Sequence, residues 1–153
     1  MNGKVLAICI SSVARGQMQH VEGVEAIIGM GLKGDRYCRG EGSYNKGATG
    51  NRQVTLISGI FFPGTGFTYA DSRRNIITGN IELMRLIGEE IRIGSAMLRG
   101  VKYCYPCDVP KSVLDKERSF REAFSDRGGL IAEVIEGGII KVGDAIIPPS
   151  KWN

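Results

Sequence analysis

Twenty-two glycines divide this chain of 153 residues into short segments, and their spacing constrains the fold more than any other feature. Glycine is about twice as frequent here as the roughly 7% that is typical of proteins. The glycines form neither a repeat nor a linker. They stand between short apolar runs, as turns stand between strands. This texture predicts a mainly β domain, a barrel or a sandwich, with few helices.

Six short runs rich in valine, isoleucine and leucine are predicted to be strands. They span residues 4–10, 53–57, 91–93, 96–101, 130–135 and 145–147. Turn signals at Gly137-Gly138 and Gly143-Asp144 separate the last runs. We therefore expect meandering antiparallel strands in the C-terminal third.

Two short helices and one long loop complete the expected organisation. Asn80 as N-cap, Glu82 in the first turn and Gly88 as a stop signal predict the first helix. The second is predicted over residues 110–124, where apolar side chains recur near one helical face. Residues 34–51 are polar and rich in glycine, which predicts a loop beside a site or a plain surface excursion.

Size, charge and hydropathy limit the function classes. A chain of this length is the usual size of one domain, so we expect a single domain over residues 1–153. No stretch reaches the roughly 18 uncharged apolar residues of a membrane span, and no signal-peptide pattern is present, so we expect a cytoplasmic protein without a membrane partner. The formal charge of +4 favours anionic partners mildly and predicts no nucleic-acid partner.

Cys104 and Cys107 form a Cys-x-x-Cys motif, and the expected location keeps the four cysteines reduced. A structural zinc site would need a second ligand pair, and Cys9, Cys38 and His20 are scattered singly. A thioredoxin-like redox pair would need a βαβ context that the chain lacks. Two buried, inert thiols are a further alternative.

The remaining interpretation of this motif is one reactive or metal-binding thiolate. Cys107 stands just before the expected helix start at residues 108–110, where free backbone N–H groups favour negative charge. Cys107 is then a better nucleophile or ligand than Cys104.

Arg73, Arg74 and Asn75 form a polar segment before an apolar pair of isoleucines. Two guanidinium groups and an amide suit a phosphate or a pterin-like heterocycle. The alternative is an ordinary solvated turn in which the arginines pair with Asp71. In the glycine-rich residues 29–35, Lys33 could likewise serve an anion, although the pattern taken alone favours a glycine-shaped turn, since the spacing of a phosphate-binding loop is missing.

The glycines of residues 126–129 are interpreted as the entry into the strand that begins at Leu130, with Arg127 facing a ligand or water.

Taken together in chain order, these segments resemble the MOSC domain, the module named for the C-terminal part of molybdenum cofactor sulfurases. The resemblance covers nearly the whole chain and implies a β-barrel with a few short helices. The segments that carry it are residues 29–35, 52–57, 73–88, 93–94, 104–107 and 127–144.

The resemblance implies that the chain binds a molybdenum cofactor (molybdopterin) or carries sulfur. Cys107 matches the cysteine of the family's motif and is expected to ligate the metal or accept sulfur, which suits a soft thiolate. The expected partners are an anionic small molecule or pterin, and an enzyme that uses the cofactor or donates sulfur. A molybdenum-dependent reductase of N-hydroxylated compounds is the first alternative, although such family members usually have further domains. A structural zinc or redox Cys-x-x-Cys protein is the second.

The resemblance also assigns roles to polar residues. Arg74 is expected to neutralise the phosphate of the ligand, and Asn75 to orient it. Further charge is expected from three other cations, Arg73, Arg52 and Lys33. Tyr37 stands where many family members have a histidine, so no imidazole is present at that point.

Overall fold

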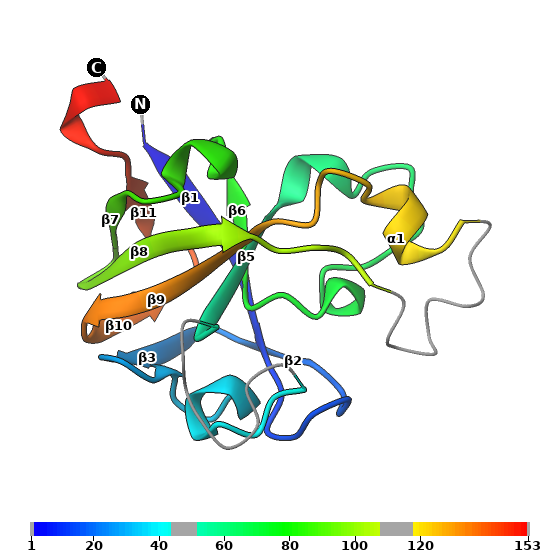
Figure 1. Cartoon of the computed structure of the whole chain (residues 1–153), viewed down its shortest axis with the longest axis horizontal. Coiled ribbons are helices and arrows are strands. Elements are labelled where there is room, and N and C mark those ends of the chain that lie inside the picture. The colour runs from blue at the N-terminus through cyan, green and yellow to red at the C-terminus, as the bar shows by residue number, and fades with distance from the viewer. Residues whose placement is uncertain (1, 44–51, 108–117, 153) are drawn as a thin grey trace.

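A closed barrel of seven strands forms the centre of the computed structural model, which describes residues 2–43, 52–107 and 118–152 (Figure 1). Around the barrel the strand order is β1, β6, β5, β9, β8, β7 and β11, and β11 pairs again with β1. Only β5 and β6 run parallel among these described neighbours. The strands are β1 Gly3–Ile10, β5 Val54–Ser58, β6 Ile76–Gly79, β7 Glu90–Ile93, β8 Ala96–Tyr103, β9 Leu130–Glu136 and β11 Ala145–Ile147.

Among the described residues, four further strands lie outside the closed barrel. The edge strand β2 (Gln19–Val21) pairs with β1, while β3 (Gly23–Ile27) lies between β4 (Gly31–Leu32) and β10 (Gly138–Lys141) in a separate sheet. The predicted fold class, a mainly β barrel with few helices, is confirmed. All six predicted runs lie in barrel strands, and the seventh barrel strand, β6, was missed.

Strands β5 and β6 are buried on both faces, because each contributes side chains to two apolar clusters. Leu56 and Ile76 point into the barrel core, whereas Ile57 and Ile77 belong to a second apolar cluster outside it. Side chains alternate across a strand, so neighbours in sequence serve the two clusters. The second cluster also contains the aromatic residues Phe62, Phe67, Phe120 and Phe124.

The helix predicted from Asn80 is a short 3-10 helix, η4 (Leu83–Leu86). Asn80 has a left-handed φ of 59° and its side chain donates to the carbonyl of Asn2, so it ends β6 instead of capping a helix. Gly88 follows the helix with a φ of 80°. The predicted extent was therefore wrong at its start, because Asn80 is used as a turn residue.

Part of the second predicted helix lies outside the described residues, since 110–117 are among those the structure does not describe. Within the described part, α1 (Phe120–Ala123) begins after Ser119, whose extended backbone and side chain cap the helix by accepting from the N–H of Glu122. A continuous helix over 110–124 is therefore wrong at Ser119. No helix in the described ranges is long and apolar enough to cross a membrane.

The predicted loop over residues 34–51 contains ordered, buried structure in its first part. Asp35 caps the 3-10 helix η1 (Arg36–Arg39) by accepting from the N–H of Tyr37 at 3.2 Å. Gly40 ends the helix with a φ of 68°. Residues 44–51 lie outside the description. The other 3-10 helices within the described ranges are η2 (Gly59–Phe61), η3 (Ala70–Ser72) and η6 (Ser150–Trp152).

Candidate functional site

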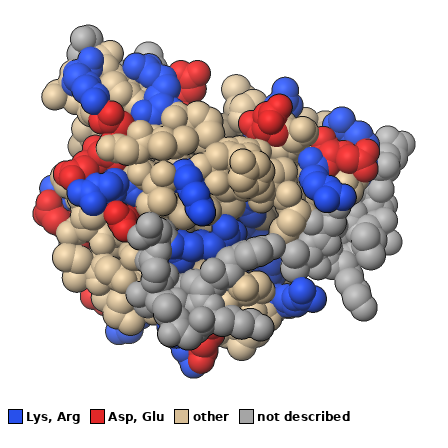
Figure 2. Space-filling model, in the orientation of Figure 1, with Lys and Arg blue, Asp and Glu red and all other residues tan. Residues whose placement is uncertain are grey.

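One pocket collects most of the predicted site residues, and we call it the arginine pocket. Its cavity volume is about 30 Å³, and it opens to solvent at its mouth. Five arginines and one carboxylate line it among the described residues, a balance that favours an anion. Figure 2 shows lysine and arginine side chains gathered in a hollow in the middle of one face. The lining residues are Arg15, Arg36, Tyr37, Ser43, Arg52, Asp71, Ser72, Arg73, Arg74, Cys107 and Phe120.

Cys107 brings a thiol to the arginine pocket from the segment that follows β8. It is half-buried, whereas Cys9, Cys38 and Cys104 are buried, so it is the most accessible of the four cysteines. The helix start predicted beside it, at residues 108–110, lies outside the described residues. The structure thus places the predicted thiol at a pocket without describing the predicted helix start.

Two of the other cysteines are chemically quiet. Burial raises the pKa of Cys9 to about 11, and its sulfur lies 3.6 Å from Nδ1 of His20. Burial, followed by the charge of Asp35, raises the pKa of Cys38. A thiol must ionise to act as a nucleophile, so neither residue competes with Cys107 near neutral pH.

Cys104 is buried and, like Cys107, is a thiol that forms no disulfide within the part of the chain that the structure describes. Among the described residues, no group of three or more His, Cys, Asp or Glu side chains could hold a metal ion.

Arg52 connects Cys104 to the arginine pocket. Its Nη2 donates to the sulfur of Cys104 at 3.6 Å, and its guanidinium lies 5.2 Å from the ring centroid of Tyr37. Burial opposes the charge of Arg52, but Cys104 and Tyr37 outweigh it and raise the pKa of Arg52 above its ordinary value. The cation therefore stays charged at the wall of the pocket.

The surroundings of Arg73 disfavour its positive charge. Its backbone has a left-handed φ of 58°, and its Nη1 donates to the carbonyl of Gly16. Its Nη2 is buried and has no hydrogen-bond partner among the described residues. Burial first, and then the charge of Arg36, lower the pKa of Arg73. A buried donor without a partner is costly, and an anion in the pocket would satisfy it.

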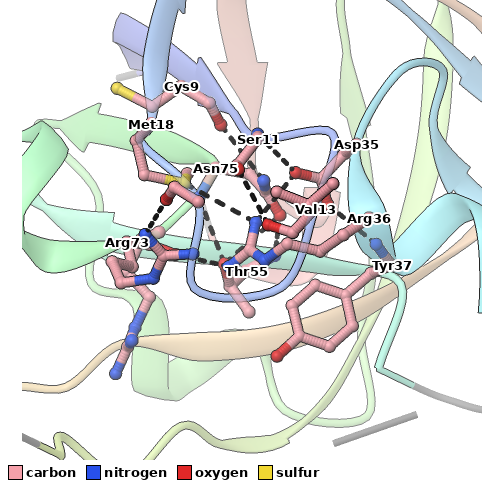
Figure 3. Close-up of polar contacts among 12 residues, drawn as sticks. Cys9, Ser11, Val13, Met18, Asp35, Arg36, Tyr37, Thr55, Arg73 and Asn75 are labelled. Atoms are coloured by element: carbon pink, nitrogen blue, oxygen red, sulfur yellow. Dashed lines mark hydrogen bonds and ion pairs between the residues drawn. The ribbon is translucent and has the colours of Figure 1, made fainter. Parts of the chain in front are cut away.

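Arg36 is a buried cation that the sequence analysis missed (Figure 3). Its Nη1 donates to the Asp35 carboxylate at 2.9 Å, and its Nη2 donates to the carbonyl of Arg73 at 3.4 Å. Asp35 also accepts from the backbone N–H of Ser11 at 3.1 Å. Asp35 thus fixes Arg36 beside Arg73, and the ring of Tyr37 lies 4.7 Å from the same guanidinium.

Arg74 lines the pocket, but its nitrogens bind the protein. Nε donates to the carbonyl of Gly128 at 2.8 Å, Nη1 to that of Ser72 at 3.1 Å and Nη2 to that of Tyr105 at 3.2 Å. Only 4% of the residue is exposed. Three of its five N–H groups are therefore used by backbone carbonyls.

Two predicted ligand residues do not line the pocket. Asn75 is fully buried beneath it, where Oδ1 accepts from the N–H of Thr55 at 3.0 Å and Nδ2 donates to the carbonyl of Cys9 at 3.1 Å (Figure 3). Lys33 is exposed and lies 4.0 Å from Glu25. The structure thus uses Asn75 to join β1 and β5 to the segment before β6, and it places Lys33 at the surface.

The fold and the site can be compared with known proteins. A family model of the MOSC domain matches residues 60–147, so the chain belongs to the MOSC domain family. This family is associated with the molybdenum cofactor and with sulfur handling. The match includes Arg73, Arg74 and Cys107, whereas Arg36 and Arg52 lie before it.

Solved structures support the same fold. A crystal structure of the YuaD protein from Bacillus subtilis has 16% identity and a TM-score of 0.76, covering 95% of this chain and 94% of that one. YiiM from Escherichia coli has 15% identity and a TM-score of 0.62, with 98% and 70% covered. YiiM from Geobacillus stearothermophilus has 13% identity and a TM-score of 0.66, with 95% and 74% covered. No protein of curated function matches the sequence significantly.

Proposed function

We propose that this protein binds a molybdopterin-type cofactor, or another anionic, sulfur-bearing small molecule, in the arginine pocket. Cys107 would ligate the metal or accept sulfur. The observation that carries the proposal is the meeting, in one pocket, of an accessible thiol with Arg73, whose buried Nη2 has no hydrogen-bond partner in the part of the chain that the structure describes. A ligand with an anionic end and a thiophilic end satisfies both.

The anionic end of the ligand would lie against Arg73, Arg36 and Arg52. Guanidinium groups bind phosphate through paired N–H donors, and the buried Nη2 of Arg73 offers a donor with no competing partner among the described residues. The negative charge of a phosphate would also offset the repulsion between the positive charges of Arg73 and Arg36. The arginine set therefore fits the phosphate of a pterin cofactor.

The thiophilic end would lie at Cys107. A thiolate is a soft ligand suited to a metal that is already bound by sulfur. When bound, a molybdopterin-type cofactor would supply a redox-active metal ion, and this chain would orient it and limit its access to water.

Sulfur transfer would use the same thiol. The Cys107 thiolate would attack the outer sulfur of a donor persulfide, forming one S–S bond while the donor's S–S bond breaks and its thiolate leaves. The protein would then carry a persulfide to an enzyme that needs sulfur or cofactor. We place this binding or carrier role before the reduction of N-hydroxylated compounds.

The test is intact-protein mass spectrometry with elemental analysis on protein purified without oxidant from a host that makes molybdenum cofactor. Wild type is compared with Cys107→Ser, and Cys104→Ser is the matched control from the same motif. We expect molybdenum with a pterin, or one added sulfur, in the wild type and the control but not in Cys107→Ser. The same content in all three proteins would overturn the role of Cys107. Turnover of N-hydroxylated compounds by the isolated protein would select the reductase instead.

A further inference from the structure

We propose that Arg74 is a positioning residue that holds residues 104–107, the Cys107 segment, at the pocket. The anion is then bound by Arg73 and Arg36 and not by Arg74. This inference rests on the proposed function. It separates two adjacent arginines that the sequence presents as equivalent. The role follows from where their nitrogens point.

The guanidinium of Arg74 ties together three chain segments. It donates to Ser72 at the end of η3, to Gly128 before β9 and to Tyr105, two residues before Cys107. The residue is 96% buried, and its bonds to Ser72 and Gly128 are shielded from water, while the bond to Tyr105 is partly buried. Because a guanidinium is planar and rigid, the three carbonyls are fixed relative to one another. The Cys107 segment is thereby fixed to η3, which leads into Arg73.

Gly128 packs closely against the same segment. A methyl group at its α carbon would collide with the carbonyl of Cys104 and lie 2.7 Å from Cδ of Pro106. The N–H of Cys104 donates to the carbonyl of Gly129 at 2.9 Å. The segment before Cys107 is therefore held both by the Arg74 hydrogen bonds and by close packing on Gly128.

The same bonds weaken Arg74 as an anion ligand. Its charge is already met by three carbonyl dipoles, which is the arrangement expected of a structural arginine. Arg73 differs, since one of its nitrogens is buried without a partner among the described residues. An added anion would gain a new hydrogen bond from Arg73 but would have to compete for Arg74.

The test measures how phosphate and the thiol are coupled. Alkylation of Cys107 by iodoacetamide is followed by peptide mass spectrometry with and without inorganic phosphate, at constant ionic strength. The phosphate-induced rise in Tm is measured on the same proteins. The variants are Arg74→Lys, Gly128→Ala and Arg73→Gln. Gly128→Ala displaces the Cys107 segment and leaves every charge in place.

In the wild type, phosphate should raise the Tm and slow the alkylation of Cys107. In Arg74→Lys and Gly128→Ala, phosphate should still raise the Tm but should no longer protect Cys107 from alkylation. The alkylation rate without phosphate should change about tenfold in both variants, since a displacement of about 1 Å can change a rate by up to about a hundredfold. In Arg73→Gln the rise in Tm should be lost. Arg74→Lys that loses the rise in Tm but keeps the wild-type alkylation rate would overturn the proposal and make Arg74 an anion ligand.

A measurement on the wild type keeps the proposal testable if Arg74→Lys does not fold. In nitrogen-15 NMR spectra, the Nε–H signal of Arg74 should exchange slowly with water and stay in place during a phosphate titration, while that of Arg73 shifts. A dose-dependent shift confined to Arg74 would refute the positioning role. If phosphate affects neither NMR signal nor the Tm, the proposed anion site is wrong. The positioning role of Arg74 would still be supported by slow exchange of its Nε–H and by equal changes in alkylation rate in Arg74→Lys and Gly128→Ala.

Discussion

The barrel interior and the buried arginines of the arginine pocket are both largely withdrawn from water, but they are stabilised in opposite ways. The interior is lined by fully buried apolar side chains such as Val5, Leu56 and Leu98, so it gains free energy from burial alone. The pocket keeps Arg36 and Arg74 at 4% exposure and needs a carboxylate or carbonyls to hold them. The barrel interior therefore needs no charge compensation, whereas the arginine pocket holds an excess of positive charge that the proposed anionic ligand would balance.

The largest expected effect breaks the apolar side of this comparison. Leu56→Ala should lower the free energy of unfolding by about 2 to 5 kcal/mol, because it removes a fully buried side chain and leaves a cavity. Urea denaturation measures the loss. Phosphate should not restore it selectively. A loss below about 1 kcal/mol would mean that the barrel relaxes around the cavity and that its interior is not the main source of stability.

The next effect concerns the support of the pocket. Asp35→Asn should cost about 3 kcal/mol, because it leaves the buried guanidinium of Arg36 without its carboxylate. Glu25→Gln is the matched control, since the Glu25 and Lys33 pair is exposed and worth less than about 1 kcal/mol. Chemical denaturation of both variants checks the prediction. Equal effects would contradict the role given to Asp35.

A smaller effect is expected at Arg73 itself. Arg73→Gln should unfold within about 1 kcal/mol of the wild type without anions, since it loses one hydrogen bond and also a partly desolvated charge. The wild type should gain about 1.4 kcal/mol at a phosphate concentration ten times the Kd, by mass action. The variant should gain nothing. Phosphate titrations followed by thermal unfolding separate the two proteins, and an equal gain in both would place the anion elsewhere.

The smallest effect is a pH dependence set by Cys9. The folded protein raises the pKa of this thiol from 9.0 to about 11, so the unfolded chain loses the thiol proton first as the pH rises. Stability is fully present below about pH 9 and should fall by on the order of 1 kcal/mol between pH 9 and 11. Cys9→Ala should reduce this fall. Denaturation at several pH values measures it, and an unchanged fall in the variant would assign it to other groups.

The barrel was readable from the sequence because its strands carry local patterns. Glycine turns and short apolar runs mark six of its seven strands without any knowledge of tertiary contacts. Strand β6 was missed because Ile76 and Ile77 are a pair too short for a period, and their opposite faces serve two different clusters. Asn80 was misread because a residue that favours helix caps also favours left-handed turns.

The site was only partly readable. The motif cysteine and Arg73 were predicted, and the structure places both at the pocket. Arg36 was missed because its neighbours in sequence suggest a solvated loop, whereas its contacts with Ser11, Met18 and Arg73 come from residues far from it in sequence. Arg73 and Arg74 have the same side chain, so only the distances to Gly128, Ser72 and Tyr105 reveal that Arg74 binds the backbone.

The most direct test of the central claim, that one ligand is held by Arg73 at its anionic end and by Cys107 at its thiophilic end, is the ligand content of matched charge variants. Molybdenum, pterin and added sulfur are quantified per mole of wild type, Arg73→Gln, Cys107→Ser and Lys33→Gln, the last removing one positive charge outside the pocket. The account predicts equal content in the wild type and Lys33→Gln, with loss in Arg73→Gln and in Cys107→Ser. No ligand in any of the four proteins, or the same content in all of them, would contradict it.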